Sequence, residues 1–359
     1  MKCGYCFYCD IAENREQGSY GFMSEDTLRS VVRAALAHAE GSCVIAFQGG
    51  EPTLRGLGFF EKLIEYQNEF NAKGVKIENA LQTNGLAIDD EFIGFLARNS
   101  FLTGISLDGS RDTHDKYRKT ASGGETFFTV IETVNRFKKL GAEFNILTVV
   151  NGDTGKKANK IYSFYKKNGL RYMQFIACLD PLNEAPGLNA HSLTPEVYGK
   201  FLCELFDLWH EDLLKGTQPY IRQFENYIGI LLGYGAESCD MRGSCGYQYV
   251  VEADGEVYPC DFYVLPEYKL GNLNEKSIAE IDARRREISF VEYSAAMRES
   301  CGACRYYAIC RGGCRRHRLI KGENGNYLNY FCESYKTFFG HALERMLAVA
   351  EKIRIGKRG

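Results

Sequence analysis

The chain has 359 residues and is 45% hydrophobic and 25% charged, which is typical of a globular protein with a sizeable core. Its 44 Lys and Arg and 46 Asp and Glu residues are interspersed and give a net charge of -2, so overall charge does not predict binding to nucleic acid or to a membrane surface. No run approaches the roughly 20 apolar residues of a membrane-spanning helix and no apolar signal core is present, so we expect a cytoplasmic protein.

Residues 24–180 alternate between helical and extended patterns. We expect amphipathic helices, the first capped by Ser24, at residues 24–40, 59–70, 89–99, 125–141 and 158–169. We expect apolar strands at residues 43–48, 75–85, 102–109, 143–150 and 171–180. This alternation predicts a parallel sheet, either open or curved into a partial barrel. The motifs GGEP, QTNG, SLDG and CLDP follow the strands, so they should face one cleft at the carboxyl ends.

The second part of the chain is rich in cysteine. Two helices, at residues 194–216 and 218–235, precede it; a hairpin is expected at Asp254-Gly255 and an amphipathic helix at residues 334–353. Eight cysteines follow the order C-x5-C-x9-G-x4-C, then C-x2-C-x5-C-x3-C, then one more. In a reducing compartment they are expected to bind metal. Eight thiolates suit either two structural zinc ions or two iron–sulfur clusters.

The first residues, MKCGYCFYCD, help to choose between these metals. Cys3-x2-Cys6 followed by Phe7, ahead of an α/β region with GGEP after a strand, resembles the radical S-adenosylmethionine (SAM) enzymes, whose C-x3-C-x2-C loop holds a four-iron cluster. The first cysteine of that pattern would lie four residues before Cys3, beyond Met1. We therefore expect the first cluster to lack one ligand and the first strand to be truncated. Cys9 does not have the family spacing, and we interpret it as an ordinary cysteine.

The later motifs narrow the resemblance. The eight cysteines are similar to the SPASM extension, which carries two auxiliary four-iron clusters. AFQGGEPTL, LQTNG, SLDG, FNIL, CLDP, YPCDFYVL and CRGGCRR resemble the anaerobic sulfatase-maturating enzymes over essentially the whole chain. The resemblance implies an α/β fold: a partial (β/α)6 TIM-like barrel over residues 1–225, a small Cys-rich SPASM domain over 226–338, and a C-terminal helix over 339–359.

The resemblance also implies which residues bind the cofactors. SAM would be bound by Tyr5, through its backbone, and by Gly49, Gly50, Glu51, Ser106, Arg118 and Leu179. Three [4Fe-4S] clusters are implied, the first held by Cys3 and Cys6. One auxiliary cluster would be held by Cys239, Cys245, Cys260 and Cys314, and the other by Cys301, Cys304, Cys310 and Cys332. The basic run at Arg315, Arg316 and Arg318 is expected to be a solvated or structural face.

The implied activity is the anaerobic oxidation of a Cys or Ser in a nascent or unfolded sulfatase to Cα-formylglycine. Asp261 would be the general base: as the neighbour of a cluster ligand it is fixed in position, and a nearby anionic cluster should raise the pKa of its carboxyl. Reduced ferredoxin or flavodoxin would donate electrons; neither nucleic acid nor a membrane is expected as a partner. Two alternatives stay open: another SPASM enzyme that installs thioether crosslinks in a peptide, and a non-catalytic scaffold stabilised by zinc.

Overall fold

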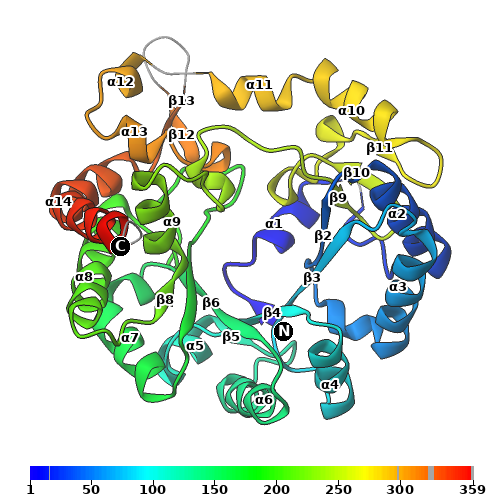
Figure 1. Cartoon of the computed structure of the whole chain (residues 1–359), viewed down its shortest axis with the longest axis horizontal. Helices are drawn as coiled ribbons and strands as arrows, with labels where there is room; N and C mark the ends of the chain where they lie inside the picture. Colours follow the sequence, from blue (N-terminus) through cyan, green and yellow to red (C-terminus); the bar gives the residue numbers. More distant parts are fainter. Residues whose placement is uncertain (16, 297–298, 322–326, 357–359) are drawn as a thin grey trace.

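The structure, a computed structural model, describes residues 1–15, 17–296, 299–321 and 327–356. Its centre is a parallel sheet of six strands in the order β2-β3-β4-β6-β7-β8. The strands are β2 (Ser42–Phe47), β3 (Lys76–Thr83), β4 (Leu102–Ser106), β6 (Phe144–Val150), β7 (Tyr172–Ala177) and β8 (Tyr220–Ile221). The sheet is curved, with helices on its outer side, as expected for a partial barrel (Figure 1).

The helices that cover the sheet form where the apolar spacing predicts them. They are α2 (Glu25–His38), α3 (Leu57–Phe70), α4 (Asp90–Arg98), α6 (Phe127–Leu140) and α7 (Ala158–Lys167), with the shorter α5 (Arg111–Tyr117) and the 3-10 helices η1 (Pro52–Arg55) and η2 (Thr154–Lys156) between them. Ser24 caps α2 as predicted, since its hydroxyl accepts from the Thr27 N–H at 3.1 Å. Buried side chains such as Phe60, Ile105 and Ile146 form the core between sheet and helices.

Three more helices complete this side of the molecule: the long α8 (Pro195–Leu214) and α14 (Cys332–Gly356), and the shorter α9 (Arg222–Leu231). α14 packs along α8 and α9, with Phe338 buried between Phe206 and Phe224. Trp209 is also buried, and its indole N–H donates to the Pro219 carbonyl at 3.0 Å. None of the described helices is both long and apolar enough to cross a membrane.

The structure differs from the predicted elements at two places and adds one pair of strands that was not predicted. The sixth strand, β8, lies in the segment 218–235 that we expected to be entirely helical, because a two-residue strand has no periodicity of its own. Lys2–Cys3 (β1) pairs antiparallel with Arg118–Lys119 (β5) and lies outside the parallel sheet. The last helix begins at Cys332, so the final predicted ligand lies in its first turn.

The cysteine-rich region is built from short elements. β9 (Val250–Val251), β10 (Glu256–Tyr258) and β11 (Gly271–Asn272) form an antiparallel sheet, and Gly255, with a φ of +88°, makes the predicted hairpin turn. The remaining elements are η3 (Cys239–Met241), η4 (Asp261–Tyr263), η5 (Pro266–Tyr268), α10 (Ile278–Glu287), α11 (Phe290–Ala295), α12 (Glu299–Gly302), α13 (Tyr307–Cys310), η6 (Arg315–His317), β12 (Arg318–Lys321) and β13 (Tyr327–Asn329). They lie across the opening of the curved sheet, from α2 to α9 (Figure 1).

The basic run is structural. Arg316 and Arg318 are buried and donate to backbone carbonyls, Arg316 to that of Asp180 at 2.8 Å and Arg318 to that of Gly313 at 3.1 Å. Arg315 lies over the Phe290 ring, with its guanidinium carbon 4.4 Å from the ring centroid. These arginines therefore hold the cysteine-rich region together and dock it on the loop after β7.

Candidate active site

The polar motifs meet at the carboxyl edge of the sheet, as predicted. Glu51 of GGEP links two of them, because its carboxylate accepts from the Thr83 hydroxyl and the Asn84 N–H of QTNG, both at 2.7 Å. It also accepts from the Thr53 N–H and hydroxyl within its own loop. Glu51, expected to bind the cofactor, thus fixes the GGEP loop against the end of β3.

The two glycines of this loop have left-handed backbones. Gly49 has a φ of +81°, and a Cβ there would lie 3.2 Å from the Tyr8 ring, so a side chain would push against that ring. Gly50 has a φ of +49°, and a Cβ there would meet nothing within 4 Å. The loop therefore packs closely on α1 (Phe7–Glu13) at Gly49 and leaves the Gly50 backbone accessible to a ligand.

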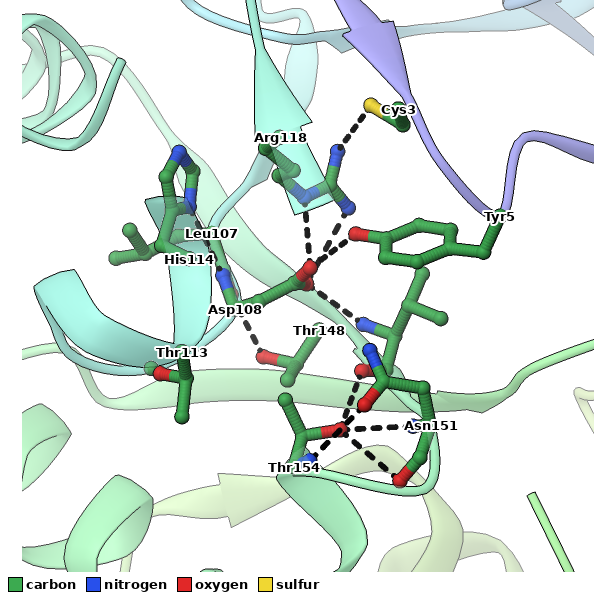
Figure 2. A network of polar contacts seen from close by, with 12 residues as sticks. Cys3, Tyr5, Leu107, Asp108, Thr113, His114, Arg118, Thr148, Asn151 and Thr154 are labelled. Carbon is green, nitrogen blue, oxygen red and sulfur yellow. Dashed lines mark hydrogen bonds and ion pairs between the residues drawn. The ribbon is translucent and has the colours of Figure 1, made fainter. Parts of the chain in front are cut away.

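A buried carboxylate, Asp108 of SLDG, organises the neighbouring part of the site (Figure 2). It accepts from the Tyr5 hydroxyl, from the Val149 N–H at 2.9 Å, and from Arg118 Nε at 2.9 Å and Nη2 at 3.3 Å. Asp108 is 0% exposed and Arg118 6% exposed, and a buried pair of this kind is stable only when its remaining hydrogen-bonding capacity is used. Here Arg118 is held in β5 and Val149 in β6, while Tyr5 lies in the turn that follows β1.

Arg118 joins this network to the first cysteines. Its Nη1 lies 3.8 Å from the Cys3 sulfur. Burial raises the pKa of the Cys3 thiol, and the Arg118 cation acts in the opposite direction by favouring the thiolate. Cys6 and Cys9 follow in the same turn, where burial raises the pKa of Cys9 to about 11 and its hydrogen bond with Cys6 adds to the shift. The three sulfurs thus lie near one another.

Ser106 and Leu179 lie at the same edge. Ser106 ends β4 and Leu179 follows β7, and both are partly buried. Tyr5 is 9% exposed and its ring lies under the Arg118 guanidinium, 5.5 Å from centroid to carbon. The predicted SAM-binding residues are therefore brought to one rim, with Arg118 turned toward Cys3 and Asp108.

Asp261 faces this rim from the cysteine-rich region. Its Oδ2 accepts from the Gln48 side chain at 3.0 Å, and its Oδ1 accepts from the Cys260 thiol at 3.3 Å. Burial raises the pKa of the carboxyl, while the hydrogen bonds from Cys260 and Gln48 oppose the shift without cancelling it. Its charge also helps to hold the pKa of the buried Tyr8 phenol well above the ordinary value.

The eight later cysteines form two groups. Burial is the main cause that raises the pKa of Cys314 to about 12, and the nearby Asp240, Cys239 and Cys245 contribute to this shift. Cys314 in turn acts on Cys260. Burial raises the pKa of Cys310 to about 11, and Cys332, Cys301 and Cys304 contribute. Grouped thiols that resist ionisation require a positive metal centre to become ligands.

The donor set of these eight residues is one that clusters use. Across the described residues, no three His, Cys, Asp or Glu side chains converge closely enough to hold one metal ion. Eight free thiols in two groups of four match the four thiolate ligands that each four-iron cluster takes.

Sequence reasoning missed Asp108, Gln48 and Tyr8 as parts of the site. All three stand inside or beside quoted motifs: Asp108 in SLDG, Gln48 in AFQGGEPTL and Tyr8 in CFYCD. Their positions next to the motifs could therefore be read from the sequence. Their contacts could not, because they are made with residues far away in the chain; Gln48 and Asp261, for example, are 213 residues apart.

Comparison with known proteins agrees with this geometry. The Radical SAM superfamily model matches residues 2–165, and the SPASM iron-sulfur cluster-binding domain model matches residues 239–305. The chain is 45% identical to a cysteine-type anaerobic sulfatase-maturating enzyme of Clostridium perfringens, over 99% of this chain and 96% of that protein. It is 31% identical to a serine-type enzyme of Bacteroides thetaiotaomicron, over 96% and 87% of the two chains.

A solved structure described as native anSMEcpe with bound AdoMet and Cp18Cys peptide matches with a TM-score of 0.92 and 45% identity, over 98% of this chain and 96% of that one. A structure of SuiB from Streptococcus suis bound to S-adenosylmethionine matches at 17% identity with a TM-score of 0.60, which supports the fold alone. The carboxyl-edge motifs, the two groups of cysteines and the likeness along the full length lead to one conclusion: the chain belongs to the anaerobic sulfatase-maturating enzymes, within the radical SAM superfamily.

Proposed function

We propose that this protein oxidises a cysteine of a sulfatase polypeptide to Cα-formylglycine, with serine as the poorer substrate. The observation that carries the proposal is the Asp261 carboxylate, which is half-buried beside Cys260 and accepts a hydrogen bond from Gln48 of the QGGEP loop. It joins the two halves of the molecule at the predicted SAM-binding rim. The identities of 45% and 31% to cysteine-type and serine-type enzymes favour cysteine.

The cofactors assigned are SAM and three [4Fe-4S] clusters. Cys3 and Cys6 would hold the first cluster, and each group of four later cysteines one auxiliary cluster. SAM would be bound along the rim by Tyr5, Gly49, Gly50, Glu51, Ser106, Arg118 and Leu179. The open backbone at Gly50 and the cation at Arg118 support this assignment, because the methionine end of SAM presents both an ammonium and a carboxylate.

When bound, SAM and its reduced cluster supply the radical that removes a hydrogen atom from the substrate β-carbon. The chain's own contribution is to hold the substrate cysteine and move a proton. Asp261 accepts the thiol proton, and its raised pKa makes it a stronger base than an exposed aspartate. Gln48 keeps the receiving oxygen in place. An auxiliary cluster held by Cys239, Cys245, Cys260 and Cys314 would supply the acceptor for the second electron of this oxidation. Water would then hydrolyse the resulting thioaldehyde to the aldehyde, and the sulfur would leave as hydrogen sulfide.

The partners follow from this chemistry. The substrate is an extended segment of a nascent or unfolded sulfatase, since a cysteine inside a folded domain would not reach the rim. A small protein carrying one electron, such as reduced ferredoxin or flavodoxin, would supply the reductant in the cytoplasm.

The test compares three peptides that share one sulfatase sequence and differ only in Cys, Ser or Ala at the target position. The holoenzyme, dithionite and SAM should convert the Cys peptide faster than the Ser peptide and leave the Ala peptide unchanged. Mass spectrometry and trapping of the aldehyde with a hydrazide would measure the product. A thioether crosslink in place of the aldehyde would support the crosslinking alternative, and zinc in place of iron would support the scaffold alternative.

A further inference from the structure

The β1–β5 ribbon places two lysines directly outside a predicted cluster ligand. In this antiparallel pair Lys2 lies opposite Lys119, and Cys3 lies opposite Arg118. Successive side chains of a strand point to opposite faces. Cys3 and Arg118 face the interior, where Arg118 reaches the Cys3 sulfur, while Lys2 is exposed and Lys119 partly exposed on the outer face. One strand of backbone separates the lysines from the cluster ligand.

This pairing costs stability. Like charges directly opposite each other on a ribbon are destabilising. On its other side Lys119 is bridged to Glu125, but the Glu125 carboxylate is ion-paired with Arg111 at 2.6 Å. Within the described ranges, neither Lys2 nor Lys119 forms an ion pair, whereas Lys116 beside them is paired with Asp153 at 2.6 Å. Two unpaired ammonium groups at this position would be stabilised by an anionic partner.

The surroundings extend the positive charge. A shallow hollow of about 740 Å³ beside the ribbon is lined by Ser110, Arg111, Asp112, Asp115, Lys116, Lys119, Glu125 and Lys160. Lys157 reaches Asp112 at its edge, at 3.1 Å. We call this surface the lysine face, formed by Lys2, Arg111, Lys116, Lys119, Lys157 and Lys160. Four carboxylates, those of Asp112, Asp115, Glu125 and Asp153, pair with four of these six cations and leave Lys2 and Lys119 as an excess of two positive charges, on a chain whose net charge is -2.

We propose that the lysine face is the docking site for an acidic one-electron carrier protein that reduces the first cluster. The inference rests on the proposed function, because it assigns the partner that starts that chemistry. One electron leaves the reduced prosthetic group of the carrier and enters the four-iron cluster; the carrier is oxidised by one electron, and no bond forms or breaks. Positive charge at this position both attracts an acidic carrier and brings it to the thin ribbon in front of Cys3.

The experiment reverses the two unpaired charges. Lys2→Glu/Lys119→Glu holoenzyme should bind reduced flavodoxin, an acidic carrier, at least about tenfold more weakly than the unaltered protein at low salt, and the dependence of Kd on salt should become shallower. Calorimetry or surface plasmon resonance measures both quantities. A second readout is the rate of 5'-deoxyadenosine release with flavodoxin divided by the rate with dithionite, which should fall by a similar factor.

Lys139→Glu/Lys167→Glu is the matched control, since both lysines are exposed, form no ion pair among the described residues, and end α6 and α7 at the opposite edge of the sheet. It makes the same change in net charge and should bind flavodoxin as the unaltered protein does. Equal weakening in both variants, or no weakening in either, would overturn the proposal. The experiment does not measure formylglycine. If the proposed sulfatase substrate were wrong, the binding of flavodoxin could therefore still be interpreted.

Discussion

At the scale of single residues, the site depends on which of two similar aspartates can take a proton. Asp261 and Asp240 each follow a predicted cluster ligand, but Asp261 faces Gln48 whereas Asp240 accepts from the Ser238 hydroxyl at 2.6 Å. Asp261→Asn keeps the shape and removes the base. We expect formylglycine formation to fall roughly 10²- to 10⁴-fold while 5'-deoxyadenosine is still released.

Asp240→Asn is the control for this prediction, because it removes the charge of another aspartate that directly follows a predicted cysteine ligand in the sequence. It should leave the ratio of formylglycine to 5'-deoxyadenosine unchanged. Peptide mass and nucleoside release are followed in the same reaction. If Asp261→Asn lowered both products together, Asp261 would support the cluster or the fold and would not be the base.

The buried pair of Asp108 and Arg118 leads to a second prediction at this scale. Asp108→Asn leaves Arg118 as a buried cation without its carboxylate, which typically costs about 3–5 kcal/mol of stability. Arg118→Met added to Asp108→Asn should recover part of that loss, because the uncompensated charge is gone. Urea unfolding of the two single variants and the double variant measures the coupling. Additive losses would mean that the two residues act independently.

At the scale of elements, the junction of α5 and α6 holds a histidine whose protonation opposes folding. His114 Nδ1 accepts from the Asp108 N–H at 3.2 Å, so its Nε2 carries the proton toward the Thr126 hydroxyl at 3.0 Å, and Thr126 donates to the Arg118 carbonyl at 2.7 Å. Burial lowers the pKa of His114 from 6.5 to about 4. The folded protein thus favours the neutral ring.

The expected pH dependence follows from this direction. Since the unfolded chain takes up the proton first, the contribution of His114 is complete above pH 6.5 and is lost as pH falls toward 4, by up to about 3 kcal/mol. His114→Gln, which can still donate to Thr126, should therefore lose less stability than the unaltered protein between about pH 7 and about pH 5. Urea midpoints at the two pH values measure the difference. Parallel losses would assign the acid sensitivity elsewhere, for example to buried His317.

Elements with a strong local pattern were predictable from the sequence, and those fixed by distant contacts were not. The apolar stripe of α6 predicts a helix and the run Phe144–Val150 predicts a buried strand, and both form where expected. β8 has two residues, and β1 is held only by β5, so neither carries a periodic signal. The motifs located the rim, but the contacts of Asp108 and Gln48 arise only when strands far apart in the chain come together.

At the scale of the whole molecule, the barrel and the cysteine-rich region are joined by contacts that cross the chain order. Gln48 and Asp261 connect them at the rim, Arg316 connects them at the loop after β7, and α14 returns to pack on α8. The two groups of cysteines also interleave along the chain. Cys314 lies with Cys239, Cys245 and Cys260, whereas Cys310, four residues earlier, lies with the other group.

This crossing leads to the last prediction. If Cys314 completes the cluster of Cys239, Cys245 and Cys260, then Cys314→Ala should disturb that cluster alone and leave the one at Cys301, Cys304, Cys310 and Cys332 intact. Iron content should fall, and one of the auxiliary electron paramagnetic resonance signals should be altered while the other is retained. Because metal binding is coupled to folding, resistance to urea should also fall in this region.

Cys203→Ala, on α8 and outside both groups, is the control and should change neither signal. Simultaneous loss of both auxiliary signals would mean that the two clusters assemble as one unit, and an unchanged spectrum would remove Cys314 from the ligand set.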